Sequence, residues 1–241
     1  MQFSVKSSIR SACGVLFLSL LTGVASAAIS VYPIHVTVNK QGSAQIKVMS
    51  ASSKMDFVKV TVKAIDNPGT KEEKERELVA GENLVLTPAK FALSTGSVRI
   101  VRMVNIVSPE IEKAYRVYFE SVDNLDESIL GDETKNNIGV NIMWGALVIV
   151  PPLQPHEDIY YLPTEHQLVN NGNVHITLKE VGLCKSKNES EDCQWSENKS
   201  TIYPQQKLTL NNPGASSISS EDKVKIKYIS SISQTMQERT L

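Results

Sequence analysis

The stretch Ile138-Gly-Val-Asn-Ile-Met-Trp-Gly-Ala-Leu-Val-Ile-Val150, followed by Pro151-Pro-Leu-Gln-Pro155, decides the fold class of this chain. The even-numbered side chains of the first stretch are all apolar, and this alternation is typical of a β-strand that buries one face. From Ala146 onward the odd-numbered side chains are apolar as well, which predicts burial of both faces there or pairing with a partner chain. The prolines cannot continue a strand, so they predict a stiff connector and a domain boundary.

On both sides of this boundary the sequence predicts short strands separated by turns. Before the prolines, alternating or β-rich runs predict strands at Ile29–Val38, Ala44–Met49, Phe57–Ile65, Leu84–Leu86, Lys90–Leu93, Ser97–Val107 and Tyr115–Val122. After the prolines they predict strands at Ile159–Leu162, Gln167–Asn170, Val174–Val181, Gln206–Leu210 and Lys223–Ser230. The charged run Lys71–Glu77 and the acidic stretch Asp123–Asn137 are interpreted as solvated loops. Because no amphipathic helix is apparent, the pattern predicts two β-sandwiches.

Residues 1–27 have the features of a secretory signal peptide. Lys6 and Arg10 form a basic start, an apolar stretch runs from Cys13 to Ala25, and Ala25-Ser-Ala27 is a small-x-small cleavage site. The apolar stretch is shorter than the ~20 residues of an ordinary membrane span. We therefore expect export and cleavage after Ala27, and a buried N-terminal helix is the alternative interpretation.

Composition and cysteine usage narrow the class of protein further. A chain with 41% hydrophobic and 21% charged residues has enough apolar material for a packed core, which disfavours intrinsic disorder. Its 25 Lys and Arg residues against 26 Asp and Glu residues argue against a nucleic-acid binder. Cys184 and Cys193 remain after cleavage, and in an exported chain this spacing predicts a short-range disulfide between neighbouring strands or across a hairpin. A free thiol is the alternative.

No local motif predicts catalysis. The four histidines, His35, His156, His166 and His175, do not form a zinc-protease motif, and the chain has neither a Gly-x-Ser-x-Gly elbow nor a glycine-rich phosphate loop. The two remaining cysteines lack nearby cysteine or histidine ligands. We predict a protein without catalytic residues, metal site or cofactor.

Several runs resemble those of periplasmic pilus-assembly chaperones. They are Ile29-Ser-Val-Tyr-Pro-Ile34, Ile65-Asp-Asn-Pro-Gly-Thr70, Tyr115-Arg-Val-Tyr-Phe-Glu120, the strand before the prolines, Asn170-Asn-Gly-Asn-Val174, the cysteine pair and Tyr203-Pro204. Their order and spacing are most similar to those of chaperones of the alternate chaperone–usher pathway, which serve class 5 fimbriae. The resemblance implies an all-β fold of two immunoglobulin-like β-sandwich domains in an L or boomerang arrangement. It places them at residues 28–150 and 157–241, with a proline-rich hinge at 151–156.

The resemblance also implies a function, donor-strand complementation. In that family the last strand of the first domain fills the groove of an incomplete fimbrial subunit, and the complex passes to the outer-membrane usher. On this sequence the subunit-binding row is Ile138, Val140, Ile142 and Trp144, with Trp144 alternatively belonging to the protein's own core. The implied location is the periplasm and the implied partners are fimbrial subunits and the usher. A self-capping homodimer of the free protein stays open.

The sequence departs from the family at the residues that hold the C-terminal carboxylate of the subunit. The usual Arg and Lys correspond here to His35 and to Ala146 or Leu147. We therefore expect Arg116 to supply the carboxylate contact, with His35 as a second candidate and an internal salt bridge of Arg116 as the alternative. Arg102 corresponds by position to an arginine of an inter-domain salt bridge.

Two other classes of protein fit some of these features. A structural fimbrial subunit or adhesin is also exported, β-rich and disulfide-bonded, but it would carry a long alternating N-terminal extension, whereas Ala28–Val38 is short and merges into the fold. A secreted enzyme on a two-sandwich fold lacks any local catalytic signature.

Overall fold

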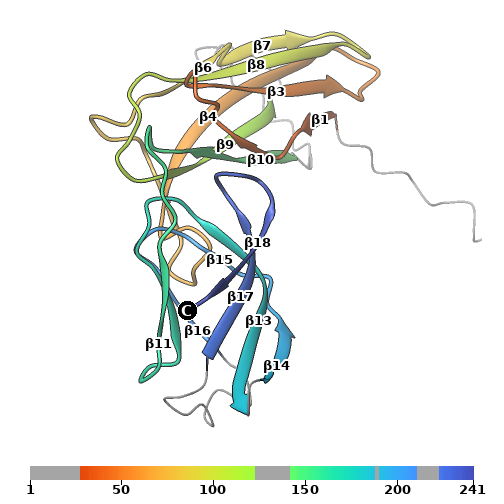
Figure 1. The fold of residues 1–241 in the computed structure, drawn as a ribbon. Coiled ribbons are helices and arrows are strands. Elements are labelled where there is room, and N and C mark those ends of the chain that lie inside the picture. Colours follow the sequence, from red (N-terminus) through yellow and green to blue (C-terminus); the bar gives the residue numbers. More distant parts are fainter. Residues whose placement is uncertain (1–27, 123–141, 188–189, 211–222) are drawn as a thin grey trace, which may run out of the picture.

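The structure is a computed structural model that describes residues 28–122, 142–187, 190–210 and 223–241 (Figure 1). These residues form strands and turns without a helix, and thus none of them belongs to a helix able to cross a membrane. The expected signal peptide, the loop Asp123–Asn137 and the residues Ile138 and Val140 lie outside the described residues.

The strands before the prolines form one β-sandwich. They are β1 (Ile29–Tyr32), β2 (His35–Thr37), β3 (Ser43–Ser50), β4 (Asp56–Asp66), β5 (Lys74–Arg76), β6 (Leu84–Thr87), β7 (Lys90–Leu93), β8 (Val98–Asn105), β9 (Lys113–Val122) and β10 (Met143–Val150). One sheet has the order β1-β3-β8-β6, and the other has the order β2-β10-β9-β4-β5, with β7 paired to β4. Alternate residues of the two sheets, including Ile46 and Val48 of β3 and Val148 of β10, are fully buried in a shared core.

The predicted strand Ile29–Val38 is two strands in the structure. β1 pairs with β3 in one sheet, whereas β2 pairs with β10 in the other, and the chain changes sheets at Pro33. A proline has no N–H group to donate to a sheet, so it is tolerated at such a break. Alternation of apolar residues alone predicted one continuous strand because it does not show which sheet a strand joins.

The interpretation of Lys71–Glu77 as a loop is wrong for its centre. Lys74–Arg76 forms β5, which pairs antiparallel with Ala64–Asp66 at the end of β4. Because both faces of this short edge strand are largely solvated, it carries no hydrophobic pattern. It is fixed instead by Arg76, whose Nε donates to Asp66 Oδ2 at 2.9 Å.

The strands after the prolines form the second sandwich. They are β11 (Ile159–Leu162), β12 (Gln167–Asn170), β13 (Ile176–Lys187), β14 (Ser190–Glu197), β15 (Thr201–Ile202), β16 (Lys207–Thr209), β17 (Lys223–Ser230) and β18 (Met236–Thr240). One sheet has the order β11-β12-β16, and the other has the order β14-β13-β17-β18, with β15 paired to β13. The strands β14, β15 and β18 were not predicted, and the predicted strand Val174–Val181 extends to Lys187. Cys184 and Cys193 face each other across β13 and β14 and form a disulfide, which confirms the predicted pairing.

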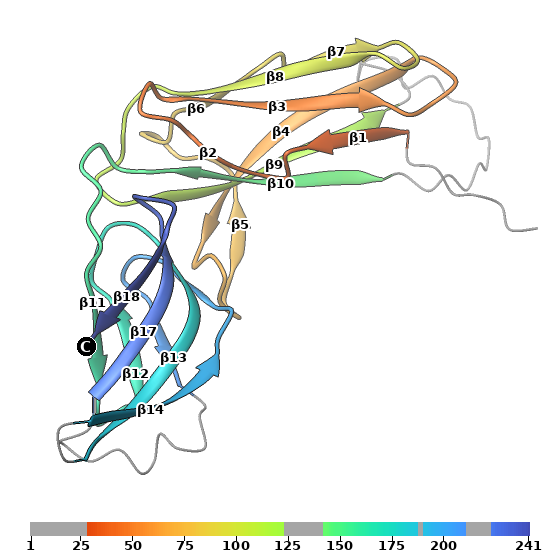
Figure 2. The same ribbon diagram turned by 45° about the vertical axis from the view of Figure 1, so that its right-hand side comes forward.

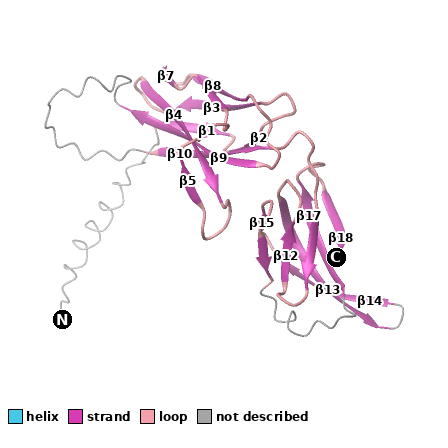
Figure 3. Cartoon of the chain, turned by 90° about the vertical axis from the view of Figure 1, so that its left-hand side faces the viewer, coloured by secondary structure: helices cyan, strands magenta, loops and turns pink. Residues whose placement is uncertain are grey.

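The two sandwiches are set at an angle, and the second lies against the β9 and β10 side of the first (Figures 2 and 3). A small apolar cluster joins them, made by Ile65, Ala114 and Ile149 of the first and Tyr203 of the second. Polar contacts lie beside it. The carboxylate of Glu112 is 2.8 Å from Nδ1 of His175, and this buried pair links the two sandwiches directly.

The turn Asn170-Asn-Gly-Asn173 is the other part of this joint. The amide Nδ2 of Asn173 donates to the carbonyl oxygens of Glu110 in the first sandwich, at 3.2 Å, and of Gln154 in the connector, at 3.0 Å. In return, the backbone N–H of Glu112 donates to the carbonyl of Asn173 at 3.0 Å. One side chain therefore ties both sandwiches to the proline connector.

Candidate functional site

The first half of β10 is an edge with one side unpaired. Along its whole length β10 pairs antiparallel with β9, from Met143 opposite Glu120 to Val150 opposite Lys113. On its other side β2 pairs only with Leu147–Ile149, so within the described residues no strand covers that side of Met143–Ala146. An edge of this kind presents backbone N–H and C=O groups to which another strand can be added.

The even-numbered side chains of β10 run from the protein's own core out to solvent. Ala146, Val148 and Val150 are buried in the first sandwich. Trp144 is half-buried, packs against the same core, and donates its indole N–H to the carbonyl of Ile29 at 2.9 Å. Ile142, just before the strand, is 43% exposed. Of the two roles open for Trp144, the packing favours membership of the protein's own core.

The odd-numbered positions of β10 lie on the opposite face of the strand, where Leu147 and Ile149 face the second sandwich. Gly145 leaves room there, because a Cβ atom at this position would lie 3.2 Å from Cδ of Arg116 and 3.2 Å from Cε1 of Tyr118. Leu147 packs with the apolar cluster that joins the sandwiches. The two faces of β10 therefore have different roles, since one completes the first core and the other lines the space between the sandwiches.

That space is a cleft of about 820 Å³. Arg116, Leu147 and the hairpin between β4 and β5 line it from the first sandwich, and Tyr203 and Lys207 line it from the second. Burial raises the pKa of Tyr203 to about 12, so its hydroxyl stays neutral. The cleft thus combines an apolar floor with cations and carboxylates at its walls.

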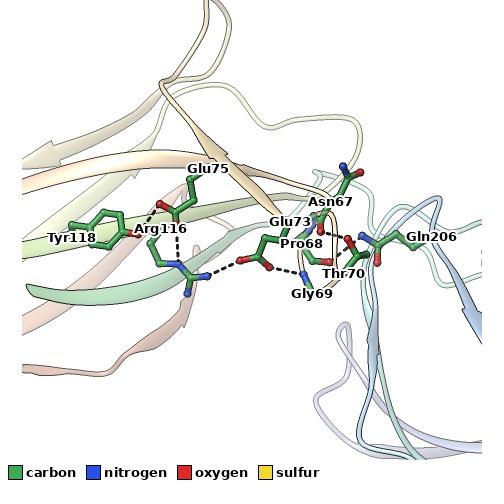
Figure 4. A network of polar contacts seen from close by, with 9 residues as sticks. All are labelled: Asn67, Pro68, Gly69, Thr70, Glu73, Glu75, Arg116, Tyr118 and Gln206. Carbon is green, nitrogen blue, oxygen red and sulfur yellow. Dashed lines mark hydrogen bonds and ion pairs between the residues drawn. The ribbon is translucent and has the colours of Figure 1, made fainter.

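Arg116 points into this cleft and is held by two carboxylates (Figure 4). Its Nη2 lies 3.1 Å from Oε1 of Glu73, and its Nε lies 3.3 Å from Oε1 of Glu75. The hydroxyl of Tyr118 donates to both oxygens of Glu75, at 2.8 and 2.6 Å. Burial, and then the hydrogen bond to Glu75, raise the pKa of Tyr118. The internal salt bridge that the sequence left as an alternative for Arg116 is therefore present in the unbound chain.

His35 lies on the other side of the same position of β10. In the paired strands, Leu147 is opposite Arg116 on β9 and opposite His35 on β2. The structure thus brings the two candidate anchors to either side of one leucine. Desolvation, and to a lesser extent the neighbouring His175, lower the pKa of His35, whereas Glu112 opposes this shift. His35 is consequently a weaker source of fixed positive charge at neutral pH than Arg116.

Arg102 lies far from this cleft. It is an exposed residue of β8, opposite Gln45 of β3 and Thr87 of β6, in the sheet that does not contain β9 and β10. In the part of the chain that the structure describes, Arg102 makes no ion pair. A carboxylate–imidazole contact between Glu112 and His175 links the sandwiches instead.

Glu73, Glu75 and Asn173 belong to the site or its joint but were not singled out from the sequence. The two glutamates lie in the charged run that was interpreted as a loop, 43 and 41 residues from the arginine they contact. The turn signals Asp66-Asn-Pro-Gly69 and Asn170-Asn-Gly-Asn173 were visible, but a turn signal does not show which distant group the turn contacts.

The hairpin that carries the two glutamates is anchored at its base by Arg76. Besides Asp66, this guanidinium binds Glu82 through two bonds of 2.6 and 2.7 Å, and the Glu82 side chain is only 10% exposed. The hydrogen bond to Arg76 lowers the pKa of Glu82 below its ordinary value of 4.5. The anchor is therefore strongest where Glu82 is ionised.

The variant Glu82→Gln is expected to lower the free energy of unfolding by about 1–2 kcal/mol at pH 7, because it removes a partly buried charged hydrogen bond. Since the pKa of Glu82 is lower in the folded state, this contribution is present above the pKa of the unfolded chain and is lost as the pH falls through the folded value. Denaturant unfolding at pH 7 and at stepwise lower pH measures it. The difference between wild type and variant should shrink at acid pH, whereas Glu77→Gln, which removes an exposed charge, should have little effect at either pH.

Comparisons with known proteins find proteins of fimbriae and chaperones of fimbrial assembly. No family model matches the chain. It is 32% identical over 196 residues to a CFA/I fimbrial subunit of Escherichia coli, covering 78% of this chain and 82% of that protein. It is 28% identical to the class 5 fimbriae chaperone CfaA, with a TM-score of 0.71 over 88% of this chain and 97% of that chain. It is also similar to a solved chaperone–tip adhesin complex, with a TM-score of 0.72, 27% identity, and coverage of 89% of this chain and 98% of that chain.

These likenesses and the fold define the class of protein, which is a fimbrial chaperone. More particularly, the chain belongs to the family of class 5 fimbrial chaperones. The predicted all-β fold of two immunoglobulin-like sandwiches is confirmed. A structural fimbrial subunit is not favoured, because the two-sandwich fold of the chaperone is matched over nearly its whole length.

Proposed function

We propose that this chaperone acts in the periplasm and binds fimbrial subunits by donating β10 to them as an additional strand. The observation that carries the proposal is the edge at Met143–Ala146, which is unpaired on one side within the described residues and is preceded by the exposed Ile142. Residues 28–150 then form the donating domain, residues 151–156 the hinge and residues 157–241 the second domain, after removal of residues 1–27.

The binding row consists of Ile142 together with Ile138 and Val140, which lie outside the described residues. Burying each aliphatic side chain in a groove contributes ~1.5–3 kcal/mol before the costs of association are subtracted. Backbone hydrogen bonds along the edge supply affinity that depends little on sequence, and the alternate side chains supply selectivity. Capping of fimbrial subunits in this way requires no catalytic step.

Arg116 is proposed to bind the C-terminal carboxylate of the subunit. It projects from the strand next to β10 and lines the cleft at the level of Leu147, beside the two positions, Ala146 or Leu147, to which the family's lysine corresponds. Its guanidinium offers two parallel N–H donors to a carboxylate. His35, on the opposite side of Leu147, is the second candidate.

The variant Arg116→Ala is expected to reduce the capture of fimbrial subunits about tenfold, because a charge-assisted contact is lost while the row on β10 is kept. Co-purification of the subunit with each variant measures the effect. Arg102→Ala is the matched control, since it removes the same charge from an exposed position on the other sheet. Equal recovery of the subunit with Arg116→Ala and with wild type would contradict the anchoring role.

Two further partners follow from the proposal. The outer-membrane usher receives the loaded chaperone, as the family resemblance implies. We also propose that two copies of the free chaperone hide the row by pairing the edges of their β10 strands. Light scattering of the free and the subunit-loaded protein measures this self-association. We expect the free protein to be a dimer and the loaded protein to be a one-to-one complex with the subunit.

Co-expression with a class 5 fimbrial subunit tests the proposal as a whole. We expect a soluble one-to-one complex in the periplasmic fraction, and loss of the subunit to aggregation or proteolysis when the chaperone is absent. If the subunit remains soluble without the chaperone, or never associates with it, the proposed function is wrong.

A further inference from the structure

We propose that Glu73 and Glu75 are built-in competitors for Arg116, which hold it in the free chaperone until the C-terminal carboxylate of a fimbrial subunit takes their place. The inference rests on the proposed role of Arg116 and adds a regulation of that site. It gives a role to two side chains for which the sequence offered only a solvated loop.

Glu73 has two partners, one on each carboxylate oxygen. Oε1 lies 3.1 Å from Nη2 of Arg116, and Oε2 accepts the backbone N–H of Gly69 at 2.7 Å (Figure 4). The bond to Gly69 keeps the carboxylate in place, so it is a positioned ligand of Arg116 rather than a freely moving surface charge. When Arg116 leaves, that bond remains.

Glu75 is arranged in the same way. It contacts Nε of Arg116 at 3.3 Å and accepts the hydroxyl of Tyr118, which lies two residues along β9 from the arginine. Tyr118 therefore continues to satisfy Glu75 after Arg116 has been released. Because each glutamate keeps a second partner, exchange of the arginine costs less than breaking an isolated ion pair.

The hairpin that carries the glutamates is fixed at both ends. Arg76 binds it to the body of the first sandwich through Asp66 and Glu82. At its tip, the carbonyl of Pro68 accepts a hydrogen bond of 3.0 Å from Nε2 of Gln206 in the second sandwich. The competitors are thus held at the wall of the cleft that Arg116 and Leu147 also line.

The two internal contacts occupy N–H donors that a carboxylate fork requires. Arg116 is only 27% exposed, and Glu73 and Glu75 take its Nη2 and Nε. A terminal carboxylate that binds side-on, through Nε and Nη2, must displace at least one of them. A bound segment that brings no carboxylate to Arg116 cannot replace the glutamates and gains no free energy there. The arrangement therefore favours a subunit whose C-terminus lies at Arg116.

The test is a competition between chaperone variants for a limited amount of subunit. A fimbrial subunit that forms a complex with wild type is unfolded and diluted into an equal mixture of wild type and the variant E73Q/E75Q. One of the two chaperones is isotope-labelled throughout, so that mass spectrometry measures how the subunit divides between them. We expect about threefold to tenfold more subunit on the variant, because two partly exposed ion pairs no longer compete. Glu72→Gln, a neighbouring glutamate that does not contact Arg116, is the matched control and should divide equally.

Two additional arms make the result specific to the carboxylate. In the first arm the subunit is extended by two glycines at its C-terminus, and E73Q/E75Q should then have no advantage over wild type. In the second arm both chaperones also carry Arg116→Ala, and the glutamate replacements should again give no advantage. Glutamine retains an oxygen to accept the N–H of Gly69, and Glu75→Gln alone serves if the double variant proves unstable. Equal division with a folded variant, or an advantage that survives the glycine extension, would overturn the inference. Failure of wild type to bind any subunit would instead overturn the proposed function.

Discussion

Replacing Ile142 by Asp is expected to abolish recovery of a soluble complex between this chaperone and a fimbrial subunit, while the isolated chaperone stays folded. Ile142 is 43% exposed and lies outside the core of the first sandwich, so a carboxylate there remains solvated in the free protein. In an apolar groove the same carboxylate would be buried without a partner, which costs several kcal/mol and removes the gain from the isoleucine. Periplasmic co-purification measures complex formation, and thermal unfolding of the free variant verifies the fold.

Met143→Asp is the matched control for this variant. Met143 is also exposed, but it is the next residue along and therefore projects from the opposite face of β10. The same charge should reduce complex formation far less there. If Ile142→Asp still retains the subunit in normal yield, or if both variants lose it equally, the even-numbered row is not the surface that enters the subunit.

The largest loss of stability is expected for Asn170→Ala, which should lower the free energy of unfolding by about 3 kcal/mol. Asn170 is fully buried. Its Nδ2 donates to the carbonyls of Val174 at 2.8 Å and Ile202 at 2.9 Å, and its Oδ1 accepts the N–H of Gly172 at 2.9 Å. Alanine leaves these backbone groups without the side chain that now pairs with them, at a cost of about 1–3 kcal/mol for each group that stays unpaired.

Guanidinium unfolding at neutral pH measures this loss. Asn171→Ala is the control, because its exposed amide makes one hydrogen bond, to Oδ2 of Asp158 at 2.9 Å. We expect it to cost less than about 0.5 kcal/mol, as is usual for a surface substitution. Equal stability of the two variants would show that the buried asparagine does not hold the turn.

Much of the strand arrangement could be predicted because most strands bury one face. In β3 and β17 every second side chain is buried, whereas in β10 the burial begins at Ala146 and includes Ile149 on the other face. These strands were found from the alternation of their apolar residues. The short or edge strands β5 and β18 expose most of their side chains on both faces, so no hydrophobic period marks them. They are held by backbone pairing to a neighbour, which a local pattern does not encode.

The candidate site was predictable in the same partial way. Ile142 and its row follow from the alternation before the prolines, and Arg116 was found from its place in Tyr-Arg-Val-Tyr. The contacts of Arg116 could not be predicted from the sequence. Glu73 and Glu75 reach it only after β5 has paired with β4 and the hairpin lies against the cleft. Ion pairs of this kind depend on tertiary arrangement and leave no periodic signal.

The double pairing of Leu147–Ile149 fixes the register of the whole of β10. A slip by one residue would move Val148 out of the core and put Leu147 in its place, so the strand cannot slide. The segment Met143–Ala146, which is open on one side, has its register set in the same way. A chain that adds to this edge meets Ile142 and Trp144 on one face of the strand and Met143 and Gly145 on the other. A partner that pairs one residue out of register has its pockets opposite the odd-numbered side chains instead of the even-numbered ones. The packing of β10 in the core of the first sandwich thus sets the register in which an incoming strand must pair with it.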